Sequence, residues 1–314
     1  MTLERFTVAP SHHAHAVMTS TPSSPALPDQ LCHLDGALLP LSQAKVSVLD
    51  RGFIFGDGIY EVVPVYAGRL FGFASHMARL DRSLQEVGIP NPHTPAGWHG
   101  IAQSLLAACP SAPSQALYLQ VTRGVAMREH TIPAGLTPTV FAMLNPMKPV
   151  ADELRARGAA CVSAEDFRWK KAHIKSTSLL GAVLARQISA QVGALETVMF
   201  RDGLLSEASA SNLWVVQHGR VSGVTPDELV LRGIRYGVIE QLCREAGIAF
   251  TLRAITREEV FAADELLLSS ASKEVLAVTQ LDGRPVGDGR PGPIYARLYA
   301  LYQQAKARAD KETM

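Results

Sequence analysis

The stretch on which the fold assignment depends is Arg168–Gln187, which reads RWKKAHIKSTSLLGAVLARQ. Its Lys175 stands just before an apolar run that predicts a helix over Thr177–Val192. A lysine at a helix boundary is most often solvated, but this one follows the apolar Ile174, and the helix has apolar positions on more than one side. An amine that is partly desolvated near the positive end of a helix can act as a nucleophile toward a carbonyl. Lys175 is therefore a candidate catalytic residue.

Three further segments combine small residues with a charged group. Ser206–Asn212 (SEASASN) places Glu207 among small polar residues, where a planar ligand could approach closely. Asp50–Tyr60 has three glycines among aromatic residues, which predicts tight turns beside a pocket. Arg128 and His130 follow a predicted strand. For these charged residues the alternative interpretation is an ordinary solvated loop.

The sequence outside these segments predicts two domains. Residues 31–144 are expected to form a smaller N-terminal α/β domain and residues 152–314 a larger C-terminal one. A linker is expected over 145–151, because two prolines there resist both helix and central strand. Strands and helices are mixed without strict alternation, which favours an α+β or mixed α/β fold over a doubly wound parallel sheet.

Individual elements follow from the period of the apolar residues and from turn signals. Two hairpins are predicted, Leu31–Leu34 with Ala37–Leu39 around Asp35-Gly36, and Glu61–Tyr66 with Arg69–Phe73 around Ala67-Gly68. Hairpin turns are also predicted at Arg201–Gly203 and at His218-Gly219. The other predicted strands are Ala116–Arg123, Val140–Leu144, Ala159–Ala164, Thr197–Phe200, Leu213–Val216, Leu266–Leu268 and Val275–Gln280. The predicted helices are one capped by Ser75 and ended by Gly88, then Thr177–Val192, Gly233–Ala246, a short helix opened by a capping box at Thr256, and Ile294–Ala307.

Composition excludes several function classes. The chain has 314 residues, a net charge of +1, and 47% hydrophobic against 19% charged residues, which indicates neither a nucleic-acid nor a membrane-surface partner. Its longest apolar stretches are too short to span a bilayer. Four scattered cysteines form no CxxC pair, so reduced thiols in a cytoplasmic protein are expected, with no metal site. They are Cys32, Cys109, Cys161 and Cys243.

Residues 1–30 are expected to form a disordered tail, because they are rich in Pro, Ser, Thr, Ala and His without apolar periodicity. The tail lacks the apolar core of a secretory signal. Its His12, His13 and His15 have no second ligand cluster, so an inert run is favoured over a metal site. Met18 is an alternative start of translation.

The joint arrangement of the segments resembles the class IV (fold type IV) pyridoxal-phosphate enzymes, and within them the D-amino acid aminotransferases. The resemblance covers about Leu31 to Tyr295. Its motifs, in chain order, are Asp50–Glu61 (DRGFIFGDGIYE), His76–Leu80 (HMARL), Gln120–His130 (QVTRGVAMREH), Arg168–Gln187, Ser206–Asn212, Leu231–Ile234 (LRGI) and Asp264–Glu274 (DELLLSSASKE). The resemblance implies a two-domain enzyme with pyridoxal 5'-phosphate held between the domains.

The same resemblance implies roles for single residues. Lys175 would be the Schiff-base lysine, and its freed amine would move the proton between the substrate Cα and the cofactor's C4′ carbon. Glu207 would pair with the pyridine nitrogen and keep it protonated. The remaining cofactor contacts would come from Arg79 and Ser270 at the phosphate, from the backbone amides of Ile234, Arg235 and Ala271, and from Leu231.

The substrate carboxylate would be bound by Tyr60, Arg128 and His130, the residues that distinguish the D-amino acid branch. In this family the corresponding loop reaches across a homodimer, so Arg128 and His130 are expected to serve the neighbouring subunit's site. Two positions depart from the family. Arg235 stands where a small hydroxyl residue is usual, and Ala271 replaces a second hydroxyl. The Arg235 side chain could replace those contacts or point into solvent.

The resulting expectation is transamination between D-amino acids, of the D-alanine and D-glutamate type, and 2-oxo acids. Two alternatives share the scaffold: a branched-chain L-amino acid aminotransferase and an aminodeoxychorismate lyase. A more distant alternative is a non-catalytic paralogue that binds the cofactor or a partner protein. It is disfavoured because both Lys175 and Glu207 are present in their motifs.

Overall fold

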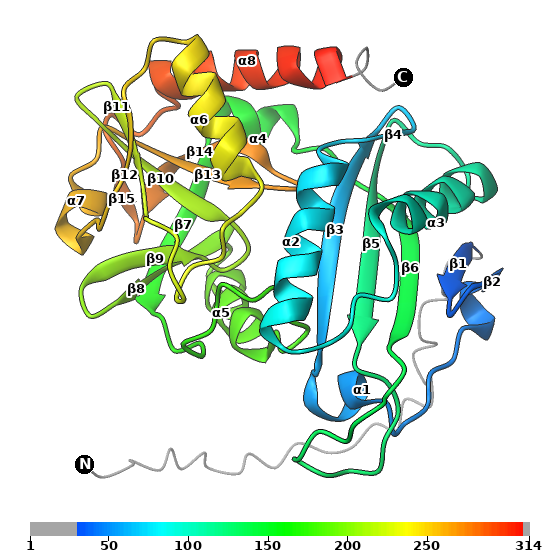
Figure 1. The fold of residues 1–314 in the computed structure, drawn as a ribbon. Coiled ribbons are helices and arrows are strands. Elements are labelled where there is room, and N and C mark those ends of the chain that lie inside the picture. The colour runs from blue at the N-terminus through cyan, green and yellow to red at the C-terminus, as the bar shows by residue number, and fades with distance from the viewer. Residues whose placement is uncertain (1–29, 310–314) are drawn as a thin grey trace, which may run out of the picture.

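The computed structural model describes residues 30–309, which form two domains, each built on its own β-sheet. Figure 1 shows the N-terminal domain beside the larger C-terminal domain. The domains are connected by the segment between β6 (Thr139–Pro146) and α4 (Asp152–Arg157). The predicted two-domain α+β architecture is confirmed.

The smaller domain is an antiparallel sheet of order β2-β1-β6-β5-β3-β4 covered by helices. Its strands are β1 (Leu31–Leu34), β2 (Ala37–Pro40), β3 (Gly58–Tyr66), β4 (Arg69–Leu70), β5 (Ser114–Thr122) and β6 (Thr139–Pro146). Its helices are η1 (Leu41–Gln43), α1 (Arg51–Phe55), α2 (Phe73–Glu86) and α3 (Pro95–Ala108). Leu80 and Leu84 of α2 and Leu105 of α3 belong to one hydrophobic core with Leu117 and Leu119 of β5, whose alternating burial confirms the predicted period of two.

The larger domain is a mixed sheet of order β12-β11-β10-β13-β14-β7-β8-β9, with β15 paired to β14. Its strands are β7 (Ala159–Glu165), β8 (Glu196–Arg201), β9 (Leu204–Ala208), β10 (Asn212–Gln217), β11 (Arg220–Gly223), β12 (Phe250–Leu252), β13 (Glu265–Ser270), β14 (Glu274–Leu281) and β15 (Arg284–Pro285). Its helices, after α4, are α5 (Leu180–Gln191), α6 (Arg235–Glu245), α7 (Arg257–Phe261) and α8 (Pro293–Ala309).

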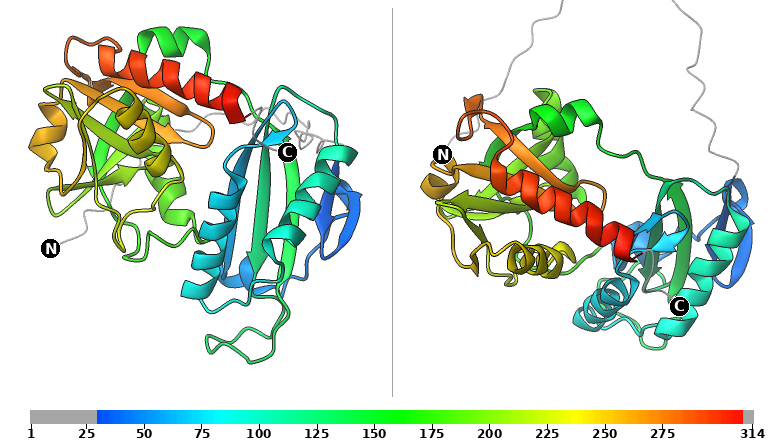
Figure 2. Two further views of the ribbon diagram at one scale, coloured as in Figure 1. Left: turned by 45° about the horizontal axis from the view of Figure 1, so that its top comes forward. Right: turned by 90° about the horizontal axis from the view of Figure 1, so that it is seen from above.

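Helices α6 and α8 bury one core of the larger domain. Ile239 and Leu242 of α6 and Leu298 and Tyr302 of α8 pack with Trp214 of β10. A second core lies around β8, β9, β13 and α7. Figure 2 shows α8 extending from the larger domain toward the smaller one. The C-terminal half of α8 therefore lies where the two domains meet.

Most predicted elements are present, and the capping box is confirmed. The Thr256 side chain accepts from the Glu259 amide, and the Glu259 carboxylate accepts from the Thr256 amide. The Asp35-Gly36, Asp202-Gly203 and His218-Gly219 turns close the predicted hairpins. The strand predicted over Arg69–Phe73 ends at Leu70, because helix α2 begins at Phe73.

Two helix starts were predicted wrongly. Helix α2 begins at Phe73 after Gly72, whose φ of 67° makes the turn into the helix, so Ser75 lies inside the first turn and is not the N-cap. Helix α5 begins at Leu180, three residues after the predicted Thr177. Thr177 is drawn away from the helix because its amide donates to the Gly58 carbonyl at 2.8 Å.

The tail predicted over 1–30 lies outside the described residues, apart from Gln30, as do His12, His13, His15 and Met18. Within residues 30–309, no helix is long and apolar enough to cross a membrane.

Candidate active site

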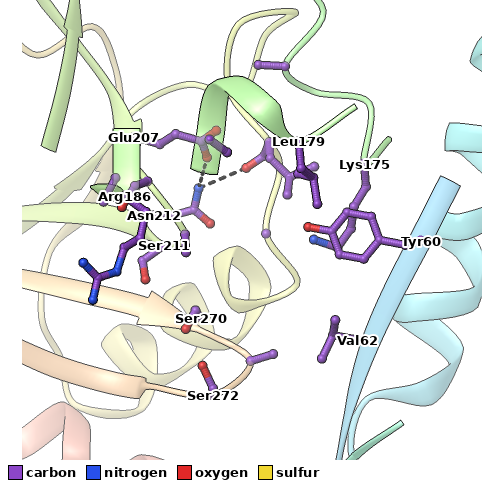
Figure 3. A pocket seen from close by; sticks show the side chains of 18 of the residues that line it. Tyr60, Val62, Lys175, Leu179, Arg186, Glu207, Ser211, Asn212, Ser270 and Ser272 are labelled. Carbon is purple, nitrogen blue, oxygen red and sulfur yellow. Dashed lines mark hydrogen bonds between the residues drawn. The ribbon is translucent and has the colours of Figure 1, made fainter. Parts of the chain in front are cut away.

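A cavity of about 1090 Å³ is lined by residues from both domains. Nine of the residues predicted from the sequence to form the site line this cavity. Arg128 and His130 do not line it. The nine are Tyr60, Arg79, Lys175, Glu207, Leu231, Ile234, Arg235, Ser270 and Ala271. Figure 3 shows Tyr60 and Lys175 on one wall and Glu207 with Asn212 on another.

Lys175 projects into this cavity from a segment that pairs with the small domain's sheet. The Tyr60 amide donates to the Lys175 carbonyl at 3.0 Å, and Ile59 forms a bridge with Ser176. The Lys175 Nζ lies 4.2 Å from the centroid of the Tyr60 ring. This amine forms no hydrogen bond or ion pair with any of the residues 30–309, so it is available to a ligand in the cavity.

Glycines in the predicted tight-turn segment allow this close approach. A Cβ on Gly56, whose φ is 67°, would lie 2.7 Å from the Ser178 Oγ, and a Cβ on Gly58 would lie 2.9 Å from the Val121 carbonyl oxygen. The Gly56 carbonyl accepts hydrogen bonds from the side chains of Thr177 and Ser178 at 2.9 and 3.0 Å. The glycines therefore hold the chain that carries the lysine against β3, beside the pocket, as predicted.

Glu207 is buried in strand β9 at the opposite wall, so the loop alternative is wrong for this residue. Its Oε1 accepts from the Arg168 Nη1 at 2.6 Å, and its Oε2 accepts from the Asn212 Nδ2 at 3.1 Å. Arg168 also donates to both oxygens of Asp166, at 2.9 and 2.8 Å. Arg201 joins the same carboxylate at 3.2 Å. The network holds Glu207 in one orientation.

Burial raises the pKa of Glu207 to about 7, although the Arg168 guanidinium opposes this shift. Desolvation also acts on Asp166, but there the hydrogen bonds and charge of Arg168 are stronger, and the pKa is lowered. Glu207 is therefore a carboxyl group whose pKa lies near neutral pH. It stands on the wall facing the unpaired Lys175 amine. A cationic N–H group in the cavity would give it a partner and favour its charged form.

Arg79 is fixed by a buried ion pair. Its Nε and Nη2 donate to the two oxygens of Glu61 at 2.7 and 2.8 Å, and the Nδ1 of His76 lies 2.7 Å from the same carboxylate. Burial alone would raise the pKa of Glu61, but Arg79 and His76 lower it to about 2. The Nη1 of Arg79 lies 3.3 Å from the Arg232 carbonyl, at the turn leading into α6.

Another buried carboxylate, Glu196, organises the loops around the cavity. Glu196 accepts from the hydroxyls of Ser209 and Ser211, each at 2.7 Å, and from the amide of Ala210 at 2.7 Å. Lys273 pairs with it at 2.5 Å. Glu196 thus ties the turn between β9 and β10 to the turn after β13, which carries Ser270 and Ala271.

Arg128 and His130 lie outside the cavity, on an exposed loop between β5 and β6 that projects past α1 in Figure 1. The Arg128 guanidinium lies 5.6 Å from the centroid of the Phe55 ring, and the His130 ring lies 5.5 Å from it. Exposed apolar side chains surround them on the same loop and on α1. They are Phe53, Val125, Met127 and Ile132.

Sequence reasoning missed five residues that hold the site: Glu61, His76, Asp166, Arg168 and Asn212. All except Asp166 lie within the segments quoted for the family resemblance. Glu61, His76 and Arg168 act through contacts between residues far apart in the chain, such as Arg168 with Glu207, and no local pattern marks such a contact. The one available signal is that charged residues recur inside otherwise apolar or small-residue segments.

Comparison with known proteins identifies the family. Residues 58–281 match the family model described as Amino-transferase class IV. The chain belongs to the class IV aminotransferases. This aminotransferase is 36% identical over 271 residues to a D-alanine aminotransferase of Bacillus licheniformis, covering 86% of this chain and 95% of the relative. It is also 36% identical over 272 residues to a D-alanine aminotransferase of Staphylococcus aureus (strain COL), with 86% and 96% covered.

Solved structures share the fold of this aminotransferase. The branched-chain amino acid aminotransferase of Escherichia coli superposes with a TM-score of 0.82 at 22% identity, covering 88% of this chain and 94% of that one. The branched-chain amino acid aminotransferase of Thermobaculum terrenum, in its PLP form (holo-form), gives 0.80 at 19%, covering 90% and 95%. The aminotransferase therefore has the fold type IV architecture. As a member of the class IV aminotransferases it uses pyridoxal 5'-phosphate as its cofactor.

The residues present fit this cofactor. The cavity holds an unpaired lysine amine for an aldehyde and, across from it, a buried carboxyl for a ring nitrogen. At the start of α6 it also holds the Arg235 guanidinium, whose Nε and Nη2 have no hydrogen-bond partner among residues 30–309. An aldehyde, a basic ring nitrogen and an anionic phosphate are the three groups that such a set would bind.

Proposed function

We propose that this aminotransferase transfers amino groups between D-amino acids, of the D-alanine and D-glutamate type, and 2-oxo acids. The observation that carries the proposal is the 36% identity to D-alanine aminotransferases over 95–96% of their length. Tyr60 and the Arg128-x-His130 loop, on which the assignment to the D-amino acid branch rests, add to it.

Lys175 is the catalytic lysine of the proposed mechanism. Pyridoxal 5'-phosphate supplies a conjugated ring that accepts electron density from the substrate Cα when the α-proton leaves. Lys175 would hold the cofactor through its amine, and the Nζ, once free, would carry the proton that leaves the substrate Cα. Its position beside Tyr60, away from any carboxylate, leaves the amine free for both tasks.

Glu207 accepts the N–H of the cofactor ring in this proposal. Arg168 and Asn212 orient the carboxylate, and burial excludes the water that would weaken the pair. A positive ring nitrogen beside Glu207 offsets the cost of its burial, so the carboxylate is charged when the ring is bound. Glu207 thereby keeps the ring nitrogen protonated throughout the reaction.

The phosphate end of the cofactor is assigned to the wall formed by Arg79, the start of α6 and the turn after β13. Donors there are the Arg79 guanidinium, the backbone amides of Ile234, Arg235 and Ala271, and the Ser270 hydroxyl. An anion at the N-terminus of an eleven-residue helix also gains from the helix dipole. Leu231 completes the proposed cofactor-binding set.

The substrate carboxylate is assigned to Tyr60, Arg128 and His130. Because Arg128 and His130 do not line their own subunit's cavity, we propose a homodimer in which this loop completes the partner's site. The exposed apolar side chains of Phe53, Val125 and Met127 near the loop are suited to burial against a second copy.

The second candidate is an L-specific branched-chain aminotransferase, the kind of enzyme whose solved structures share this fold. At 19–22% identity, that likeness reports the fold and carries no preference for a substrate. The two candidates differ in how the substrate carboxylate is held and share the roles of Lys175 and Glu207.

An activity panel on one enzyme preparation tests the proposal. D-alanine, D-glutamate, L-alanine, L-leucine, L-valine and aminodeoxychorismate are each supplied to the same amount of enzyme. The acceptor is 2-oxoglutarate for alanine, leucine and valine and pyruvate for D-glutamate, so that each transfer gives a new product. We expect the highest kcat/KM for D-alanine or D-glutamate. A preference for L-leucine or L-valine would overturn D-specificity, and pyruvate release from aminodeoxychorismate would indicate a lyase.

A further inference from the structure

Helix α6 begins with a buried arginine that lacks a counter-charge. The Arg235 side chain lines the cavity, yet the residue is only 2% exposed. Its Nε and Nη2 have no hydrogen-bond partner, and it forms no ion pair with any residue from 30 to 309. A guanidinium is charged at every physiological pH, so this is a permanent cation with unsatisfied donors.

The surroundings of Arg235 only partly compensate for its burial. Its guanidinium carbon lies 5.2 Å from the centroid of the Phe71 ring and 5.8 Å from that of Tyr302. Aromatic faces attract a cation, but they accept no conventional hydrogen bond from it. Buried charges in proteins are almost always paired and hydrogen-bonded. The Nε and Nη2 of Arg235 therefore lack an acceptor, which an anion in the cavity would supply.

The groups around Arg235 indicate which kind of anion would bind there. Its own amide and that of Ile234 lie at the N-terminus of α6, where no side chain caps the helix. Arg79, the other cation of this wall, has its Nε and Nη2 committed to Glu61. Ala271 in the neighbouring turn offers only its backbone amide. One charged ligand with several oxygens could satisfy both the helix end and the unpaired guanidinium.

We propose that the Arg235 side chain is a charged anchor for the cofactor phosphate. This inference rests on the proposed function for the location of the phosphate. Arg235 and Ala271 stand where hydroxyl residues are usual in the family, so one guanidinium takes the place of two neutral hydroxyl donors. Two consequences follow. Phosphate recognition depends more strongly on charge, and it becomes sensitive to salt.

A purely structural role is the competing explanation. Phe71 lies at the small domain's edge and Tyr302 on α8, with their ring centroids 6.0 Å apart. Arg235 could then serve only to hold these rings together at the domain junction. In that case its loss would destabilise the protein and affect all ligands alike, whether or not they carry a phosphate.

The test compares Arg235→Met, which removes the charge, with Arg235→Lys, which keeps it. Arg244→Met is the matched control, because Arg244 lies on the same helix with a side chain 75% exposed. Apoenzyme of each variant is titrated with pyridoxal 5'-phosphate and with pyridoxal, which lacks the phosphate. The melting temperature of each apoenzyme is also measured with and without inorganic phosphate.

We expect Arg235→Met to weaken pyridoxal 5'-phosphate binding roughly 10- to 100-fold, as for the loss of a charge-assisted hydrogen bond. Its affinity for pyridoxal should stay close to wild type, and inorganic phosphate should no longer raise its melting temperature. Arg235→Lys should retain most of the phosphate response, and Arg244→Met all of it.

Equal weakening of pyridoxal and pyridoxal 5'-phosphate would overturn the inference and support the structural role. An unchanged response to inorganic phosphate in Arg235→Met would also overturn it. If Arg235→Met does not fold, the response of Arg235→Lys to phosphate decides between the two explanations. These outcomes are independent of substrate choice, because a wild-type preference for L-leucine would remove the D-amino acid proposal and leave the phosphate result intact.

Discussion

The Nη1 of Arg168 lies 2.6 Å from the Oε1 of Glu207, and this pair joins the buried carboxylate of β9 to Asp166 at the end of β7. The two residues are 39 positions apart in the sequence, and the strands they join, β7 and β9, lie on either side of β8 in the sheet. The guanidinium opposes the rise in the pKa of Glu207 that burial causes. Arg168 is therefore a positioning residue that also controls the charge of the carboxylate.

Replacing Arg168 by Met should raise the pKa of Glu207 further, because burial then acts without the opposing cation. The neutral carboxyl would hold the protonated ring nitrogen less well, and kcat should fall about 10- to 100-fold, as for the loss of a charged hydrogen bond. Absorbance spectra of the bound cofactor against pH would show the change at the ring nitrogen. Arg201→Met is the control, because Arg201 bonds Asp166 but not Glu207. Equal effects of the two substitutions would contradict the assignment.

Lys175→Ala should remove transamination by removing both the covalent link to the cofactor and the proton-moving amine. The expected loss in kcat is at least about 10²- to 10⁴-fold, the range for removal of a general acid–base group. Borohydride treatment of the wild-type enzyme, followed by peptide mass spectrometry, should place the reduced cofactor on Lys175. Lys171→Ala should behave as wild type, because Lys171 is half exposed and pairs with Glu228. Near wild-type turnover in Lys175→Ala would make the central assignment wrong.

Glu61→Gln should destabilise the protein in a pH-dependent way. The pKa of Glu61 is lowered from 4.5 to about 2, so its contribution to stability is present above pH 4.5 and is lost as pH falls toward 2. The free energy of unfolding at pH 7 should drop by about 3 kcal/mol. Denaturant unfolding at a series of pH values should show the difference from wild type shrinking below pH 4.5. Glu86→Gln, an exposed position on α2, should show no such trend.

Arg128→Leu should raise the KM for D-alanine, with a loss on the order of 2–4 kcal/mol in kcat/KM, as for truncating one partner of a desolvated charge pair. Cofactor binding should be unchanged, because Arg128 lies outside the cavity. Arg244→Leu is the control for the loss of an exposed arginine. A KM close to that of wild type would mean that Arg128 lies in an ordinary solvated loop and does not bind the substrate.

The proposed exchange of loops between subunits makes a sharper prediction. Sedimentation should first show a dimer. In the proposed mechanism, Lys175→Ala dimers lack the catalytic amine and Arg128→Leu dimers turn over poorly at low D-alanine concentration. A mixed dimer contains one site with an intact lysine and an intact arginine from the partner. Dissociating and reassociating the two variants together should therefore restore activity. No recovery in verified mixed dimers would show that Arg128 acts within its own subunit.

How far the sequence determines this structure differs between elements. Local signals were sufficient for the hairpins and for the Thr256 capping box, because these depend on residues close together in the chain. The start of α5 was missed because Thr177 and Ser178 bond to Gly56, more than a hundred residues away, before the helix begins. Tertiary contacts here override the apolar periodicity on which the prediction relied.

The candidate site shows the same division. Lys175 and Glu207 stand in recognisable segments, and the structure places both in one cavity. The side chain of Arg235 could not be placed from sequence, because its burial depends on Phe71 and Tyr302 from two distant elements. A charged residue beside a helix start looks the same in sequence whether solvent or aromatic rings surround it.

Because the Lys175 segment pairs with β3, catalytic activity should depend on how the two domains are placed relative to each other. Lys175 follows the small domain through the Tyr60 amide and the bridge between Ile59 and Ser176, whereas Glu207 moves with the large domain's sheet. A shear or opening between the domains would separate the amine from the carboxylate while every strand stays paired. On mild heating or at low denaturant concentration, transamination activity should therefore be lost while circular dichroism still shows intact secondary structure.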